Sequence, residues 1–118
     1  MIRLIGKFKH GVGNFSRRPI EPFRNATGEQ LQNGTINVDV GQPFRFREHF
    51  HVPESQVPPV FGWQGDYRFE ICRVEGAWGY RIKGGHPPNI VEVMSASEIK
   101  KDGRELRDGD ELLLEFFE

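Results

Sequence analysis

The chain has 118 residues and a formal net charge of −1, with 36% hydrophobic and 28% charged residues. Its length predicts one domain, residues 1–118, with a core of its own. The near-zero charge argues against nucleic-acid binding, and no apolar run approaches the roughly 20 residues of a membrane span. The single cysteine, Cys72, excludes an internal disulfide, so the cytoplasm is the expected compartment.

Short alternating runs, separated by 14 Gly and 8 Pro, predict a mainly β domain. The expected strands are residues 2–9, 35–40, 43–50, 66–74, 77–83, 89–94 and 111–117. One or two short helices are also expected, at residues 19–27, ended by Gly28, and at residues 95–101, where Ser95 and Glu98 form a capping-box pattern. Because short strands would otherwise leave many open edges, we expect a compact barrel of six to seven strands.

The first predicted strand runs into HGVGNF, which comprises His10, Gly11, Val12, Gly13, Asn14 and Phe15. The two glycines would let backbone N–H groups approach a phosphate closely. The segment lacks the G-K-[ST] of a Walker A loop, and no helix follows at once as in a dinucleotide fingerprint. An ordinary hairpin turn has the same pattern, so the residues alone leave both interpretations open.

The segment NGTINVDV, residues 33–40, alternates polar and apolar residues as a strand with one buried face does. Thr35 and Asn37 would share the polar face. Hydroxyl and amide oxygens are hard donors that suit Mg²⁺, which takes few protein ligands together with water and phosphate oxygens. A strand face that is merely exposed to water explains the pattern equally.

Glu92 lies in NIVEVM, on the same predicted strand face as Ile90 and Met94. A carboxylate among apolar neighbours requires a partner, either a ligand or an arginine such as Arg81 on a neighbouring strand. The predicted helix start after Ser95 would offer backbone N–H groups to an anion, although most such starts bind nothing. Two histidines at strand spacing, His49 and His51, supply too few ligands for a metal site.

The order of these motifs along the chain is more specific than any one of them. G-x-G-x-F in residues 11–15 is followed by G-T-x-N-V in residues 34–38, by C-R-V in residues 72–74 and by the closing IVEVMSASEIKKDGRELRDGDELLLEF. This succession resembles the archaeal CTP-dependent riboflavin kinase family over nearly the whole chain.

The resemblance implies a barrel of the cradle-loop type that transfers the γ-phosphoryl group of CTP to riboflavin, giving FMN and CDP. It assigns nucleotide binding to residues 10–15 and to Ser97, Glu98, Ile99 and Lys100, the magnesium ion to Thr35 and Asn37, and flavin binding to Glu92. The implied partners are riboflavin and CTP, with neither nucleic acid nor membrane, and the expected assembly is a monomer or a small homo-oligomer.

The chain departs from the family pattern in places. Asn33 stands where the family usually has Pro, and Ile99-Lys100 stands where it tends to have Leu-Arg. The segment RIKGGHPPN lacks an expected flavin-binding Thr, for which His86 or Asn89 would substitute. Two other functions therefore stay open, namely a non-catalytic nucleotide- or flavin-binding barrel and a protein-interaction module, since the final hairpin also resembles those of forkhead-associated and ubiquitin-like domains.

Overall fold

The computed structural model of the protein describes residues 1–10, 24–25, 27–31, 35–53, 55, 66–83 and 87–117. Within these residues the chain forms a seven-stranded sheet. The strands are β1 (Ile2–Lys9), β2 (Ile36–Asp39), β3 (Phe50–Val52), β4 (Tyr67–Val74), β5 (Ala77–Ile82), β6 (Ile90–Ser95) and β7 (Glu111–Phe116). The expectation of a mainly β protein is confirmed.

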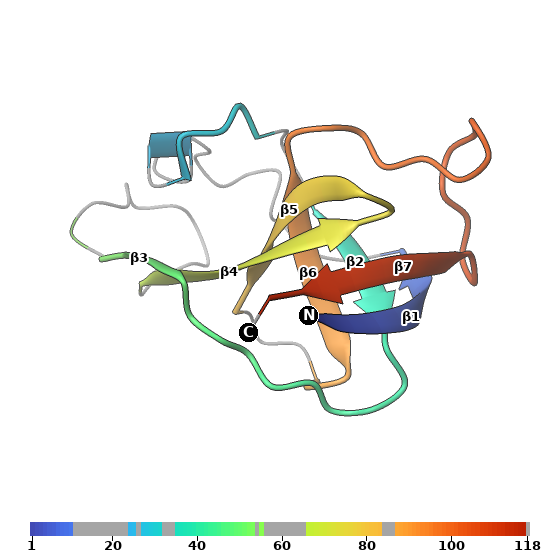
Figure 1. Ribbon diagram of the computed structural model, residues 1–118, viewed down its shortest axis with the longest axis horizontal. Helices are drawn as coiled ribbons and strands as arrows, with labels where there is room; N and C mark the ends of the chain where they lie inside the picture. The colour runs from blue at the N-terminus through green and yellow to red at the C-terminus, as the bar shows by residue number, and fades with distance from the viewer. Residues whose placement is uncertain are drawn as a thin grey trace.

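Six strands close into an antiparallel barrel in the order β4-β5-β6-β2-β1-β7, and β7 pairs back onto β4 (Figure 1). Strand β3 lies outside this ring and pairs with the first half of β4, through Tyr67–Phe69. The second half of the same edge of β4 is taken by β7, through Cys72–Val74. Closure removes the open edges that a six-stranded sheet would otherwise expose, as the sequence led us to expect.

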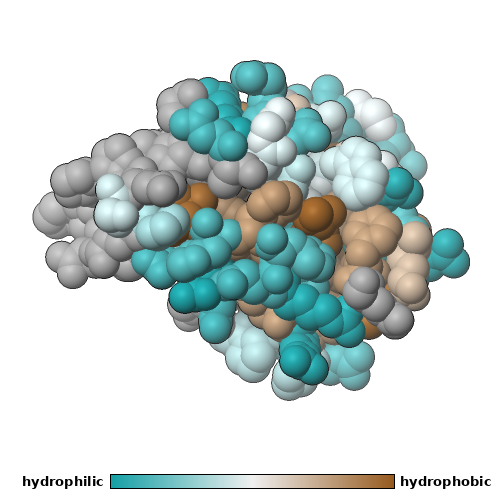
Figure 2. Space-filling view, turned by 60° about the vertical axis from the view of Figure 1, so that its left-hand side comes forward, coloured by the Kyte–Doolittle hydropathy of each residue, from teal (hydrophilic) through white to brown (hydrophobic). Residues whose placement is uncertain are grey.

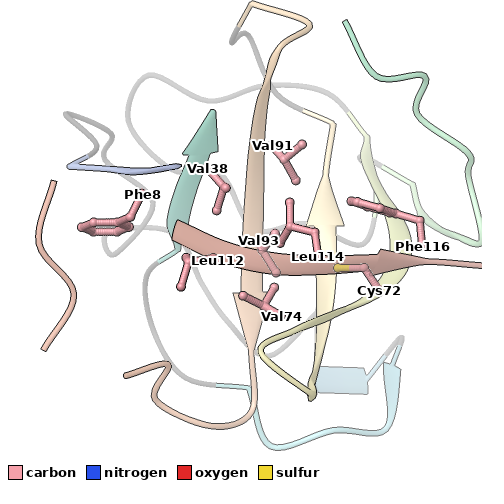
Figure 3. Packing of buried hydrophobic residues seen from close by; sticks show 9 residues of the cluster. All are labelled: Phe8, Val38, Cys72, Val74, Val91, Val93, Leu112, Leu114 and Phe116. Carbon is pink, nitrogen blue, oxygen red and sulfur yellow. The ribbon is translucent and has the colours of Figure 1, made fainter. Parts of the chain in front are cut away.

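The barrel interior is filled by alternate residues of its strands (Figure 3). These buried side chains are Phe8, Val38, Cys72, Val74, Val91, Val93, Leu112, Leu114 and Phe116. The interior is narrow at Gly79, where an added Cβ would lie 2.7 Å from Cγ1 of Val93. Cys72 is fully buried here, and burial raises the pKa of its thiol to about 12, so it acts as a small apolar side chain.

A second apolar cluster covers the outer face of β4, β5 and β6. It contains Leu31, Val52, Tyr67, Phe69, Tyr80, Ile82 and Met94. Figure 2 shows apolar side chains reaching the surface in a band that is bordered by hydrophilic ones. These strands are therefore packed on both faces, and outward-facing positions of β6 are also buried.

A buried ion pair lies inside the barrel, between Arg81 of β5 and Glu70 of β4, with Nη1 3.3 Å from Oε1. Arg81 also donates to the carbonyl oxygens of Phe44 (2.8 Å) and Arg45 (3.2 Å). Desolvation raises the pKa of Glu70 and lowers the pKa of Arg81. Arg81 is not the partner of Glu92, the alternative to a ligand that the sequence left open, because the two side chains lie on opposite faces of the sheet.

The bonds made by Arg81 also explain why the strand expected at residues 43–50 is wrong except at Phe50. The carbonyl groups of Phe44 and Arg45 are taken by a guanidinium, and the N–H of Phe44 donates to the carbonyl of Pro88 at 3.0 Å. The segment therefore crosses the end of the barrel without a partner strand. Pairing begins only at Phe50.

The helix expected at residues 95–101 is also wrong. Ser95 ends β6, and its hydroxyl donates to the carbonyl of Trp78 (3.0 Å) and accepts from the N–H of Ser97 (3.2 Å). This local turn replaces the helix cap that the same serine would otherwise form. A tight hairpin follows, in which Asp102 and Gly103 have φ values of 52° and 75° between the bridged residues Lys101 and Arg104.

The helix expected at residues 19–27 is confirmed only at its end, since residues 19–23 lie outside the described part. Arg24, Asn25 and Thr27 are helical, and the N–H of Gly28 donates to the carbonyl of Arg24 at 2.8 Å. Gly28 has a φ of 72°, the left-handed conformation in which helices commonly end. Within the described residues, no helix is long and apolar enough to cross a membrane.

The barrel interior makes a testable prediction at two adjacent leucines of β7. Leu114 is fully buried in the interior, whereas Leu113 is half-buried on the outer face. We expect Leu114→Ala to lower the free energy of unfolding by about 2–5 kcal/mol, since it leaves a cavity. Leu113→Ala should cost about 1 kcal/mol or less. Urea denaturation of both variants measures the difference, and equal losses would contradict the assigned strand faces.

Candidate active site

Strand β2 brings three of the predicted site residues together. It pairs with β6 so that Asn37 lies directly opposite Glu92. Thr35, two residues earlier, lies on the same face, and its hydroxyl donates to Oε2 of Glu92 at 2.8 Å. Asn37 and Glu92 are only 6% and 8% exposed. Thr35, Asn37 and Glu92, which were expected to bind the metal and the flavin, thus form one largely buried polar cluster, the β2–β6 cluster.

The amide oxygen of Asn37 is buried and has no hydrogen-bond partner among the described residues. Such a group costs stability, so it requires an explanation. Because Thr35 uses its hydroxyl hydrogen on Glu92, the lone pairs of its oxygen remain able to meet a cation. Together with the nearby carboxylate, these oxygens fit Mg²⁺, which completes its shell with water and phosphate.

Asp39, the third polar residue of this face, stabilises the turn after β2 and is not part of the cluster. Its Oδ1 accepts from Nδ2 of Asn89 (3.0 Å) and from the N–H of Gly41 (2.8 Å), and its Oδ2 lies 3.4 Å from Nζ of Lys9. The hydrogen bond from Asn89 is the main cause that lowers the pKa of Asp39. Asp39 therefore fixes the turn after β2, and the amide of Asn89 is engaged there.

A cleft of about 240 Å³ opens beside the β2–β6 cluster, and we call it the upper cleft. It is lined by Phe8, Thr35, Ile36, Val93, Ser95, Ser97, Glu98, Ile99, Glu105 and Leu106. Thr35 and three of the four residues predicted to contact the nucleotide after β6 therefore share one cavity. The fourth, Lys100, is exposed and does not line it.

A larger cavity of about 510 Å³ lies at the opposite end of β6, and we call it the aromatic pocket. Its walls are Pro43, Phe44, Arg45, Phe46, Arg81, Ile82, Lys83, Pro87, Pro88 and Ile90. Ile82 lies directly opposite Glu92 in the β5–β6 ladder, and Ile90 precedes Glu92 on the same face. Two wall residues of this pocket are therefore neighbours of Glu92 in the sheet.

The aromatic pocket was not predicted from the sequence. In the strand expected at residues 43–50, Phe44 and Phe46 would have been ordinary packing residues. The available signal was the alternation of Phe and Arg in FRFR, residues 44–47, between two proline-containing segments. Aromatic and cationic side chains in a segment that fails to pair as a strand are available to line a cavity.

His10 follows the last residue of β1 and adjoins Phe8, which lines the upper cleft. Its N–H donates to Oδ1 of Asp108 at 2.8 Å, and its Nδ1 lies 2.5 Å from the same oxygen. The ring of His10 packs edge-on against Phe8, with centroids 5.2 Å apart. The other residues of the predicted glycine-rich loop (11–15), and His86, lie outside the described residues.

The remaining histidine pair forms no common site. Nδ1 of His49 accepts from the N–H of Ile71 at 2.9 Å, whereas Nε2 of His51 lies 2.6 Å from Oδ2 of Asp66. Among the described residues, no group of three or more His, Cys, Asp or Glu side chains is arranged to hold a metal ion. A cation near Asn37 would therefore depend on hydroxyl and amide oxygens as much as on carboxylates.

Comparison with known proteins supports the resemblance seen in the motifs. No family model matches the chain. The chain is 26% identical to the riboflavin kinase of Pyrococcus abyssi (strain GE5 / Orsay) over 122 residues, an alignment that covers 95% of this chain. The chain spans 57% of the length of that protein. The protein is thus distantly similar to an archaeal-type riboflavin kinase, as the order of its motifs indicated.

Proposed function

We propose that this protein is a riboflavin kinase that transfers the γ-phosphoryl group of CTP to riboflavin, giving FMN and CDP, in the cytoplasm and as a single domain. The observation that carries the proposal is the β2–β6 cluster, where the unpartnered oxygen of Asn37 lies beside the Thr35–Glu92 hydrogen bond. Thr35 of this cluster lines the upper cleft, and Ile82 and Ile90, which neighbour Glu92 in the sheet, line the aromatic pocket. Transfer of a phosphoryl group between two substrates requires two binding sites near the groups that take part in the reaction.

The upper cleft is the proposed nucleotide site. Its walls combine apolar side chains with the hydroxyls of Thr35 and Ser97. They include Phe8 of β1, the strand that precedes the glycine-rich loop to which the resemblance assigns nucleotide binding. Thr35 and Asn37 would hold Mg²⁺ at the phosphate end. When bound there, Mg²⁺ neutralises charge on the phosphate oxygens.

The aromatic pocket is the proposed site of the flavin ring. Phenylalanine and proline side chains provide flat apolar walls, and Arg45 and Lys83 provide hydrogen-bond donors at the margin. Ile90 lines the aromatic pocket, and Ile36 lines the upper cleft. Ile36 pairs with Val93, which lies three residues after Ile90 in β6, just as Asp39, the partner of Ile90, lies three residues after Ile36 in β2. Three residues of strand span roughly 10 Å. A ribityl chain extending along β6 would bring its terminal hydroxyl to Glu92.

In this arrangement Glu92 accepts a hydrogen bond from the attacking hydroxyl of riboflavin and orients it. The new bond joins that oxygen to the γ-phosphorus of CTP, and the bond from this phosphorus to the bridging β-oxygen breaks. CDP leaves with the electron pair of that bond, and the hydroxyl proton is released to solvent. Phosphoryl transfer depends mainly on such positioning and on charge neutralisation, so no protein nucleophile is required.

The proposal is tested by incubating the purified protein with riboflavin, Mg²⁺ and either CTP or ATP, and by separating the flavins chromatographically. We expect FMN to form with CTP and not with ATP. Binding of riboflavin and CDP without FMN formation would instead identify a non-catalytic relative. That alternative is favoured by one observation, since Asn89, which would substitute for the missing flavin-binding Thr, donates from Nδ2 to Asp39.

The variant Asn37→Leu separates a functional role of this side chain from a structural one. Because Oδ1 has no partner in the described structure, its removal should leave the free energy of unfolding unchanged or raise it by about 1 kcal/mol. Mg²⁺-dependent FMN formation should fall at least about 100-fold, as for a lost transition-state contact. Asn89→Leu is the control, since it breaks the bond to Asp39 and should cost stability. Full activity of Asn37→Leu would contradict the metal-site assignment.

A further inference from the structure

The Asp-Gly-Asp turn before β7 contains two aspartates with different partners. Asp110 bonds within its own hairpin, since its Oδ2 accepts from the N–H of Arg107 (2.8 Å) and from Nη1 of Arg104 (2.8 Å), and its Oδ1 accepts from Nη2 of Arg104 (2.8 Å). Asp108 instead reaches His10, which is 98 positions away in the sequence. The hydrogen bonds of Asp110 stabilise the hairpin itself, whereas the contact of Asp108 with His10 lies outside the hairpin and requires another explanation.

The backbone fixes the position from which Asp108 reaches His10. The N–H of Phe8 donates to the carbonyl of Asp110 (2.8 Å), and the N–H of Gly109 donates to the carbonyl of Phe8 (2.9 Å). The turn is therefore attached to the end of β1 independently of the Asp108 side chain. The carboxylate then determines how the chain leaves β1, because it binds both the N–H and the ring of His10.

This contact also sets the orientation of the imidazole. Nδ1 donates to Asp108, so Nε2 is the ring nitrogen left for a ligand. His10 lies on the same face of β1 as Phe8, whose ring lines the upper cleft and contacts the imidazole. The side chain of His10 does not line the cleft itself, but it is 70% exposed beside this wall residue.

We propose that Asp108 is a positioning residue for nucleotide binding. It holds His10 beside the upper cleft as an imidazolium whose Nδ1–H donates to Asp108 and whose Nε2–H faces the phosphates of the nucleotide. This inference rests on the proposed function and extends it to a residue to which the resemblance assigns no role.

The expected effect of removing the Asp108 carboxylate on nucleotide affinity is opposite to the effect that charge alone would have. Removing a carboxylate near an anionic nucleotide would by itself tighten binding. A positioning role predicts that Asp108→Ala weakens binding of Mg²⁺–CDP about five- to tenfold, as for a lost charge-assisted hydrogen bond. His10→Ala should cause a similar loss, and the double variant should lose no more than the stronger single variant, because the two residues act as one unit.

The experiment measures the dissociation constant of Mg²⁺–CDP by calorimetry, with KM for riboflavin and the melting temperature as companions. Asp108→Ala should leave KM for riboflavin within about twofold, and the melting temperature nearly unchanged, because an exposed pair contributes little to stability. Asp108→Asn retains an acceptor oxygen and should recover most of the affinity. Asp102→Asn is the matched control, since it removes the same charge from the other Asp-Gly turn and has no contact with His10.

The experiment distinguishes failure of the positioning role from failure of the proposed function. If the unmodified protein binds CDP and Asp108→Ala binds it equally or more tightly, the positioning role is wrong and the proposed function stands. A parallel rise of KM for riboflavin would likewise overturn it, since the loss would then be general. If the unmodified protein binds no cytidine nucleotide, the proposed function fails and this inference fails with it.

Discussion

The register of β2 between its two neighbours is the constraint on which the candidate site depends. This short strand pairs with β1 through Asn37 and Lys9 and with β6 through Asn37 and Glu92. A slip of one residue would turn Asn37 into the barrel and Val38 out of it, so the apolar core holds the register in place. The register that buries Val38 in the core therefore also places Asn37 opposite Glu92.

The two buried carboxylates of the described structure lie on opposite faces of the sheet and have different surroundings. Glu70 lies inside the barrel and is compensated by Arg81, which also fastens the segment containing Phe44 across one end. Glu92 lies on the outer face of β6 and accepts from the hydroxyl of Thr35. Glu70 therefore supports the fold, and in the proposed reaction only Glu92 contacts a substrate.

Much of the fold could be predicted, because buried residues repeat every two positions in strands with one buried face, as in β1 and β7. The failures arose from contacts between residues that are distant in the sequence. Ser95 was expected to cap a helix, but its hydroxyl donates to the carbonyl of Trp78 on the neighbouring strand β5. The pairing of Thr35 with Glu92, and of His10 with Asp108, depends on barrel closure between residues far apart in sequence. No local pattern contains that information, and the glycine-rich loop (11–15) stays a prediction.

The most direct test of the account is the position of the metal in a crystal of the protein grown with Mn²⁺ and CDP, located by anomalous scattering. We expect the ion within about 2.3 Å of Oδ1 of Asn37 and of the hydroxyl oxygen of Thr35, at the phosphate end of CDP in the upper cleft. An ion bound to CDP elsewhere, with Oδ1 of Asn37 still unpartnered, would contradict the account.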